Sequence, residues 1–250
     1  NTLYIFAFAY FNLSFNRLAE IGTDKSGQLI IVILTIKLFD LVCFNQKSKR
    51  IEKILFLVPL LAFCITLKTY FLPYILLSFV LFFINNKQIK NLKFILNSKL
   101  LIFFIFILFF NFLHHFISTG CFISPLSFTC FGDYFLWARD IPDIKNLSIW
   151  LEQWAKAGAN PNFRVDNSEE YIQKLNWFSN WFYEYFFTTV SDFLFGIIFI
   201  IIIFLIFFAS SKKNKTNIKG NKSIYLVLLL LFMEWFYNHP SLRYGGYSLI

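Results

Sequence analysis

The sequence predicts an all-α fold: a polytopic bundle of about six or seven transmembrane helices with a helical extracytoplasmic loop. Hydrophobic residues make up 58% of the 250 residues and charged residues only 15%. Soluble domains carry about 45–50% apolar and about 25% charged residues. The mean hydropathy of +0.61 agrees with this contrast. Because so little charge is available to cover a water-exposed surface, these figures exclude an ordinary soluble domain.

The apolar runs predict the individual spans. A helix needs about 20 apolar residues to cross the hydrocarbon, and fewer where it is broken or tilted. In chain order the predicted spans cover residues 28–44, 54–66, 70–84, 100–117, 192–209 and 224–237, with 2–13 as the end of an earlier span. Pro59 and Pro73 fall inside two of these runs, which are therefore predicted to be short and broken. We expect one membrane domain over residues 1–250, as a fragment of a longer chain.

Lysine-rich loops predict the orientation. Segments 46–53, 87–99 and 211–222 contain four, four and five basic residues and lie on one side of the threaded spans. The positive-inside rule places them in the cytoplasm, and loop 119–187 then lies in the periplasm. This distribution explains the net charge of +9. We therefore expect the lipid bilayer, and no nucleic acid, as a partner.

Two cysteines lie nine positions apart in the predicted outer loop. Cys121 and Cys130 flank Pro125 in a segment that resembles a closed turn. On the oxidising side of a membrane such a pair is expected to form a disulfide, provided that the Cα atoms approach to about 5–6 Å. Metal binding is the alternative, although no histidine lies between the two cysteines.

Two amphipathic helices are predicted in the same loop. The first covers Asn146–Gly158 and ends at a Gly158 C-cap. The second begins at Asp166, with acids in its first turn, and carries many aromatic residues up to Phe186. So many rings just before a span favour a helix that lies in the outer membrane interface. A platform for carbohydrate is the alternative.

Ionisable residues beside the spans are the candidates for chemistry, because charge near the hydrocarbon is costly. Lys68 lies at the outward tip of the two proline-containing segments, where it either binds a phosphate or reaches to the lipid headgroups. Glu20 and Asp24 lie four apart in the first outer loop. These two carboxylates either hold a metal, act as a general base, or pair with neighbouring bases.

The C-terminal segment concentrates polar residues where the last span emerges. Glu234, His239 and Arg243 precede the pair Gly245-Gly246, which permits an unusual turn. Arginine recognises phosphate with two parallel hydrogen bonds, so the segment fits an anionic lipid headgroup. The alternative is ordinary anchoring at the interface. No resident metal site is predicted, and the cofactor question stays open, with a divalent metal as one option.

Five segments carry a family resemblance: Glu20-Ile-Gly-Thr-Asp24-Lys-Ser-Gly-Gln, Leu-Lys68-Thr-Tyr-Phe-Leu-Pro, Gly-Cys121…Thr-Cys130-Phe, Trp150…Trp154-Ala-Lys-Ala-Gly and Leu-Arg243-Tyr-Gly-Gly. Together they resemble an uncharacterised group of bacterial multi-pass inner-membrane proteins associated with surface-polysaccharide synthesis. The layout is also similar to that of the C-superfamily (GT-C) of lipid-linked-sugar glycosyltransferases, in which short lysine-bearing hairpins recur.

The resemblance implies an enzyme that uses a polyprenyl-phosphate-linked sugar on the outer face. Asp24 and Glu20 would then be the catalytic carboxylates, and Lys68, Arg243, His239 and Glu234 would bind the substrate. The GT-C catalytic acid lies in the first outer loop, which precedes Asn1 if the chain is a fragment; Asp24 would then assist with a metal or with the acceptor. The alternatives are a non-catalytic polysaccharide assembly protein and a lipid or solute transporter or flippase.

Overall fold

The computed structural model describes most of the chain as helix. Among the described residues there is no β-strand, apart from one isolated bridge between Cys121 and Cys130. The all-α prediction is therefore confirmed for this part of the chain. The structure describes residues 23–43, 50–77, 98–158, 165–208, 222–242, 244 and 245, together with Tyr4, Ile5 and Ala7.

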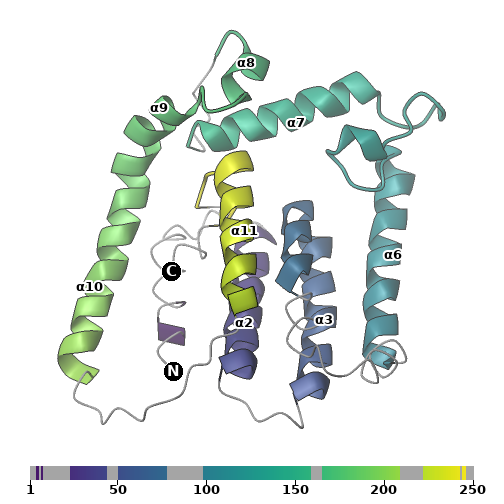
Figure 1. Ribbon diagram of the computed structural model, residues 1–250. Coiled ribbons are helices and arrows are strands. Elements are labelled where there is room, and N and C mark those ends of the chain that lie inside the picture. Colours follow the sequence, from purple (N-terminus) through teal and green to yellow (C-terminus); the bar gives the residue numbers. More distant parts are fainter. Residues whose placement is uncertain are drawn as a thin grey trace.

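Helices α2, α3 and α6 form a layer of neighbours (Figure 1). Helix α3 (Arg50–Leu67) packs against both α2 (Thr23–Cys43) and α6 (Lys99–Thr119). Helix α11 (Lys222–Asn238) adjoins α2, where the Phe39 and Tyr225 rings meet edge to face at 6.1 Å between centroids. The nearly continuous apolar composition favours helices because each helix satisfies its own backbone hydrogen bonds.

Pro59 does not break the helix in which it lies. Helix α3 runs through it to Leu67, held between α2 and α6. The prediction of a short, broken segment is therefore wrong at this proline. The second proline does mark a change, since Pro73 lies in the 3₁₀-helix η2 (Thr69–Tyr74) that follows α3. Residues 78–84 of the span predicted there lie outside the described residues.

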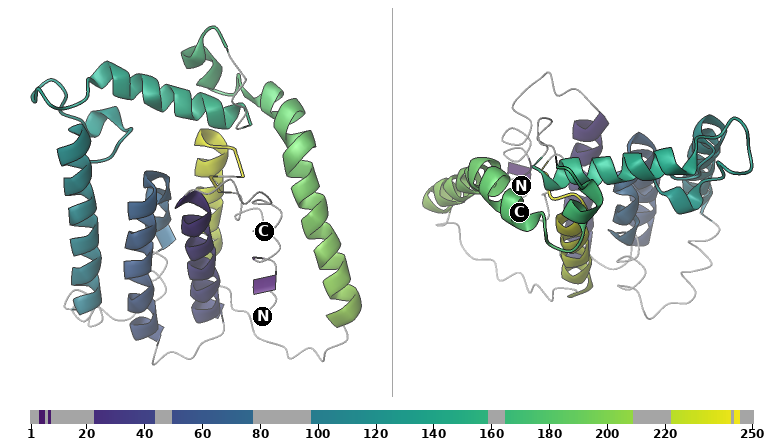
Figure 2. Two further views of the ribbon diagram at one scale, coloured as in Figure 1. Left: turned by 180° about the vertical axis from the view of Figure 1, so that it is seen from behind. Right: turned by 90° about the horizontal axis from the view of Figure 1, so that it is seen from above.

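Helix α7 (Ile141–Lys156) crosses one end of the bundle (Figure 1). We call this the α7 end. The chain then forms the short helix α8 (Ser168–Ile172), followed by α9 (Phe178–Trp181), the π-helix η4 (Phe182–Val190) and α10 (Ser191–Phe208). The last three follow one another directly. Figure 2 shows α6 and α10 at opposite edges of the molecule.

Two helices of the described chain are long and apolar enough to cross a membrane: Lys99–Thr119, and Phe178–Ile203 within α9, η4 and α10. Three shorter apolar helices, Ser26–Phe39, Leu57–Leu67 and Ile224–Asn238, coincide with further predicted spans. Length and composition therefore support two crossings and do not by themselves support a bundle of six or seven. The predicted piece 2–13 lies almost wholly outside the described residues.

The helices of the predicted outer loop differ in detail from the expectation. Helix α7 begins at Ile141, five residues before Asn146, because Pro142 occupies its first turn. The predicted second helix is divided: α8 starts as expected with an Asn167 cap, but the chain turns at Lys174, where φ is 52°. Regular helix resumes only at Phe178.

Part of the aromatic surface assigned to the membrane interface is buried inside the protein. Trp177, Trp181 and Tyr185 are buried, and the Trp181 ring meets Phe236 of α11 at 5.5 Å between centroids. Tyr183 and Phe187 on the same helix are exposed. The helix therefore has one aromatic face that packs on α11 and one that is exposed on the protein surface.

Candidate functional site

Asp24 and Lys68 meet at the α7 end of the bundle. Asp24 lies in the first turn of α2, where a negative charge favours the helix. Lys68 follows the last residue of α3 in an extended conformation and precedes η2. Because α2 and α3 are packed neighbours that run in opposite directions, these two positions are adjacent. The Lys68 Nζ atom lies 3.3 Å from Asp24 Oδ1.

The two partners differ in their access to solvent. The Asp24 side chain is 6% exposed, whereas the Lys68 side chain is 45% exposed. A buried carboxylate needs partners, since its charge is costly to desolvate. Lysine carries three N–H donors, and a contact with one carboxylate oxygen leaves the others for a further anion. The buried Asp24 carboxylate therefore fixes the position of the Lys68 ammonium, which remains accessible to solvent.

Gly27 allows the close approach that brings this pair together. A Cβ atom at this position would lie 2.2 Å from Cε2 of the buried Phe71 ring in η2. The Cys64 thiol of α3 also lies 3.8 Å from the Gly27 carbonyl oxygen, to which it donates. Glycine is needed here for space between α2 and the α3–η2 hairpin, and not for an outer-loop turn.

The segment after α11 folds back over the buried aromatic face. The Trp181 indole donates to the Pro240 carbonyl at 2.5 Å, and the Trp235 indole donates to the Ser241 carbonyl at 2.9 Å. Gly245 adjoins the same indole, since a Cβ there would lie 2.5 Å from Trp235 Cδ1. These contacts fix the backbone at Pro240 and Ser241.

The same segment also reaches α2. The Leu242 N–H donates to Tyr185 Oη at 2.9 Å, and the Leu242 carbonyl accepts from Gln28 Nε2 at 3.5 Å. Gln28 is fully buried one turn after Asp24. The backbone of Leu242 therefore connects the segment after α11 both to η4 and to the start of α2.

Tyr244 joins three further segments. Its ring lies 5.2 Å from Tyr70 of η2, 5.7 Å from Trp154 of α7 and 5.6 Å from His239, all measured between centroids. The hairpin that carries Lys68, the end of α7 and the end of α11 thus converge at this ring. Of the predicted site residues, Lys68 and His239 belong to these converging segments, and Asp24 of α2 joins them through its contact with Lys68.

His239 has an environment that disfavours positive charge. Burial, and next the nearby Lys156 ammonium, lower the pKa of its imidazole to about 4. The imidazole is therefore neutral at neutral pH. It is suited to donating or accepting a hydrogen bond, and its predicted part in substrate binding would be of that kind.

Lys156 is a buried cation that the sequence-based list of site residues omitted. Its side chain is fully buried, and its Nζ atom donates to Glu152 at 2.5 Å and to the Ile172 carbonyl at 2.7 Å. It also lies 5.4 Å from the Trp177 ring centroid and 4.9 Å from that of Tyr237. In the sequence, Glu152 and Lys156 lie one helical turn apart and could have been predicted to pair. Such a spacing, however, usually indicates an exposed face of a helix.

The disulfide loop supports the hairpin. Cys121 and Cys130 are bonded, as their spacing predicted, and their Cα atoms lie 4.0 Å apart, closer than the expected distance of about 5–6 Å. Between them, the Ser124 carbonyl accepts a hydrogen bond of 3.2 Å from Thr69 Oγ1. Because Thr69 directly follows Lys68, the closed loop buttresses the backbone beside the exposed ammonium.

The remaining predicted residues do not join the cluster in the described structure. Glu234 lies on α11, where it accepts a hydrogen bond of 3.3 Å from Asn238 Nδ2. Glu20 and Arg243 lie outside the described residues. Within the part of the chain that is described, no three His, Cys, Asp or Glu side chains are grouped so that they could hold a metal ion.

Comparison with protein families gives one match over the whole chain. The model of a family described as a domain of unknown function (DUF8201) matches residues 1–250. Comparisons with curated proteins and with solved structures gave no match.

Proposed function

The chain belongs to the DUF8201 family, and we propose that it is an integral membrane protein of the bacterial inner membrane with a glycosyltransferase-like activity. Its substrate would be a polyprenyl-phosphate-linked sugar, used at the outer face in surface-polysaccharide assembly. The observation that carries this proposal is the Lys68–Asp24 pair, in which an accessible ammonium is held by a buried carboxylate.

The proposed topology has the α7 end in the periplasm and six or seven crossings. In support, the basic segments 46–53, 87–99 and 211–222 all adjoin helix ends that lie away from α7, such as Cys43, Lys99 and Phe208 (Figure 1). The three shorter apolar helices would complete the bundle between the two long ones. The positive-inside rule then assigns the opposite end to the cytoplasm.

The proposed chemistry is transfer of the sugar from its phosphate carrier to an acceptor hydroxyl. The acceptor oxygen bonds to the anomeric carbon, the bond from that carbon to the phosphate oxygen breaks, and the phosphate leaves with the electron pair. A carboxylate takes the hydroxyl proton. Lys68 would stabilise the charge that develops on the departing phosphate.

The geometry suggests different roles for the two carboxylates predicted to be catalytic. Asp24 is 6% exposed and engaged with Lys68, which leaves little room for an acceptor hydroxyl. We therefore assign Asp24 to positioning Lys68. Glu20, four residues earlier, is the remaining predicted proton acceptor. Arg243, beside the fixed Leu242 backbone, is proposed as a second phosphate ligand.

Native mass spectrometry of gently extracted protein tests the phosphate site. Polyprenyl phosphate, or its sugar-linked form, is expected to accompany the wild-type chain and to be lost from Lys68→Ala and Arg243→Ala. Lys145→Ala is the matched control, because Lys145 is also exposed and lies 3.1 Å from a carboxylate, that of Glu169, on α7 and α8. Equal lipid occupancy in the Lys68→Ala and control proteins would refute the phosphate site.

One observation favours a second candidate function, a non-catalytic assembly protein. The loop between α6 and α7 exposes several large apolar side chains, namely Phe122, Leu126, Phe128, Tyr134, Leu136 and Trp137. Such a surface suits binding of a partner protein. If only bulk phospholipid accompanies every variant, this candidate is preferred over the enzyme.

A further inference from the structure

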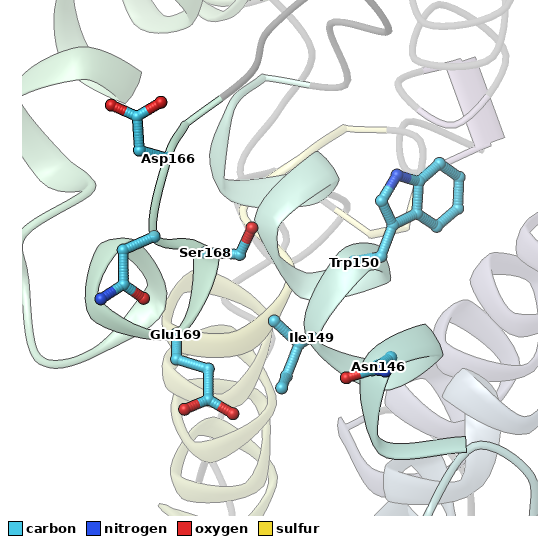
Figure 3. A pocket seen from close by; sticks show the side chains of 7 residues that line it. Asn146, Ile149, Trp150, Asp166, Ser168 and Glu169 are labelled. Atoms are coloured by element: carbon cyan, nitrogen blue, oxygen red, sulfur yellow. The ribbon is translucent and has the colours of Figure 1, made fainter. Parts of the chain in front are cut away.

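A second site lies on α7, separate from the Lys68–Asp24 pair. A pocket of about 340 Å³ opens between α7 and the start of α8, and Figure 3 shows its lining. This volume is within the usual range of small-molecule sites, about 300–1,000 Å³. None of its lining residues belongs to the cluster around Lys68. The lining is Asn146, Ile149, Trp150, Asp166, Asn167, Ser168 and Glu169.

The two walls come from different elements. Asn146, Ile149 and Trp150 are spaced three and four residues apart, which places them on one face of α7. The opposite wall is the continuous run 166–169 at the start of α8. In Figure 3 Asp166 and Glu169 lie on one side of Ile149 and Ser168, and Asn146 and Trp150 lie on the other.

Hydrogen bonds and an ion pair hold the walls in register. The Ser168 hydroxyl donates to Gln153 Oε1 of α7, and Lys145 Nζ of α7 lies 3.1 Å from Glu169 Oε1. Asn167 Oδ1 accepts from the Glu170 N–H at 3.1 Å and caps α8. The pocket is therefore formed by a fixed contact between α7 and α8.

The chemistry of the lining selects a class of ligand. The Asn146 amide can donate to and accept from hydroxyl groups, and the Asp166 carboxylate can accept from them. The Ser168 hydroxyl and the Glu169 carboxylate, already engaged with Gln153 and Lys145, keep lone pairs that can accept further hydrogen bonds. The described lining contains no lysine, arginine or histidine, and the two acids disfavour an anion. Trp150, with 51% of its surface exposed, adds an indole that can pack against an apolar ring face.

We propose that this pocket binds a neutral saccharide, with the indole of Trp150 against the C–H face of a sugar ring and the polar side chains on its hydroxyls. The two acids of the lining disfavour phosphate and other anions, although Lys145 beside the pocket offsets part of the charge of Glu169. This inference does not rest on the proposed enzymatic function, because a glycan-binding assembly protein would need the same site. In an enzyme, the pocket would hold the growing glycan at a distance from the Lys68 phosphate site.

The test is binding of the purified full-length chain, in lipid nanodiscs, to an array of neutral oligosaccharides that includes glucans, mannans, galactans and chitooligosaccharides. We expect binding to at least one class, weakened by roughly tenfold or more in Trp150→Ala, the loss of one good ring contact. Asp166→Asn, which keeps the shape and removes the charge, tests the polar wall and is expected to change the preference among sugars.

Trp137→Ala is the matched control, since Trp137 is also 51% exposed but lies in the loop between α6 and α7. Binding is expected to survive in this variant and in Lys68→Ala, which separates the saccharide site from the phosphate site. Two results would overturn the proposal: no wild-type binding above background to any sugar on the array, or equal weakening by Trp137→Ala and Trp150→Ala. Circular dichroism of each variant checks that it is folded.

Discussion

Two lysines at the α7 end, Lys156 and Lys68, have a carboxylate partner but opposite surroundings. Lys156 is fully buried, and its ammonium is engaged by Glu152, a backbone carbonyl and two aromatic rings. Lys68 is 45% exposed, and its partner Asp24 is the buried member of the pair. A buried ammonium such as that of Lys156, surrounded by protein partners, holds segments together. An ammonium such as that of Lys68, which contacts the protein on one side and solvent on the other, can still bind a ligand.

The largest effect is expected from Lys156→Met. The change keeps the volume of the side chain but removes the charge that Glu152 and the Ile172 carbonyl contact. Breaking a buried pair costs about 3–5 kcal/mol. We expect the lower end, because Glu152 retains some access to water. The free energy of unfolding of the detergent-extracted protein, measured by denaturant or thermal unfolding, checks this.

Lys145→Met is the control for that measurement, because its pair with Glu169 is exposed on both sides. Exposed pairs contribute about 0–1 kcal/mol. If both lysine variants lose the same stability, Lys156 is not the structural cation that its burial indicates.

Gly27→Ala is expected to have the next largest effect. The added methyl group would overlap Phe71 of the hairpin that carries Lys68. Overpacking of this kind costs about 1–3 kcal/mol. The double variant Gly27→Ala/Phe71→Leu should recover part of the loss, as followed by the thermal unfolding midpoint. An equally destabilised double variant would show that the close approach is not the cause.

The pH dependence of stability is expected to report on the buried Lys156 ammonium, because this ammonium affects the pKa of His239. Its pKa in the folded protein is lowered to about 4, first by burial and then by Lys156, from an ordinary value of 6.5. Between these values the unfolded chain binds more protons, so this contribution to stability is complete above pH 6.5 and declines as the pH falls toward 4. His239→Gln should flatten the pH dependence of the unfolding midpoint over this interval.

Lys156→Met tests whether the Lys156 ammonium acts on His239, because this change removes one of the two causes of the lowered His239 pKa. The folded pKa of His239 should then rise, so the pH-dependent loss should still begin near pH 6.5 but end at a higher pH and be smaller. An unchanged pH profile in this variant would mean that the ammonium does not act on His239.

The smallest effect on stability is expected from Lys68→Met. The Lys68 ammonium is half-exposed and screened by solvent, and the buried Asp24 carboxylate keeps a further interaction within the protein, so the loss should be only about 1 kcal/mol. Unfolding measurements should place this variant close to wild type while its retained polyprenyl phosphate is lost. A stability loss as large as that of Lys156→Met would assign Lys68 a structural role and break the distinction between the two lysines.

Much of this protein follows from local sequence. The apolar runs predict helices α2, α3, α6, α10 and α11, because composition alone decides which segments avoid water. The nine-residue spacing of Cys121 and Cys130 predicts their disulfide, and the capping residue Asn167 starts α8 within two positions of the expected start. Each of these features depends on residues that are close together along the chain.

The tertiary structure alone decides which side chains meet. Asp24 reaches Lys68 because the consecutive helices α2 and α3 pack side by side in opposite directions, with Gly27 leaving the space. Lys156 and the aromatic face of Trp177, Trp181 and Tyr185 look like water- or lipid-facing residues in sequence, yet they are buried by α8, α11 and the segment after it. Periodicity specifies a face of a helix, but only packing between helices determines whether that face meets protein, lipid or water.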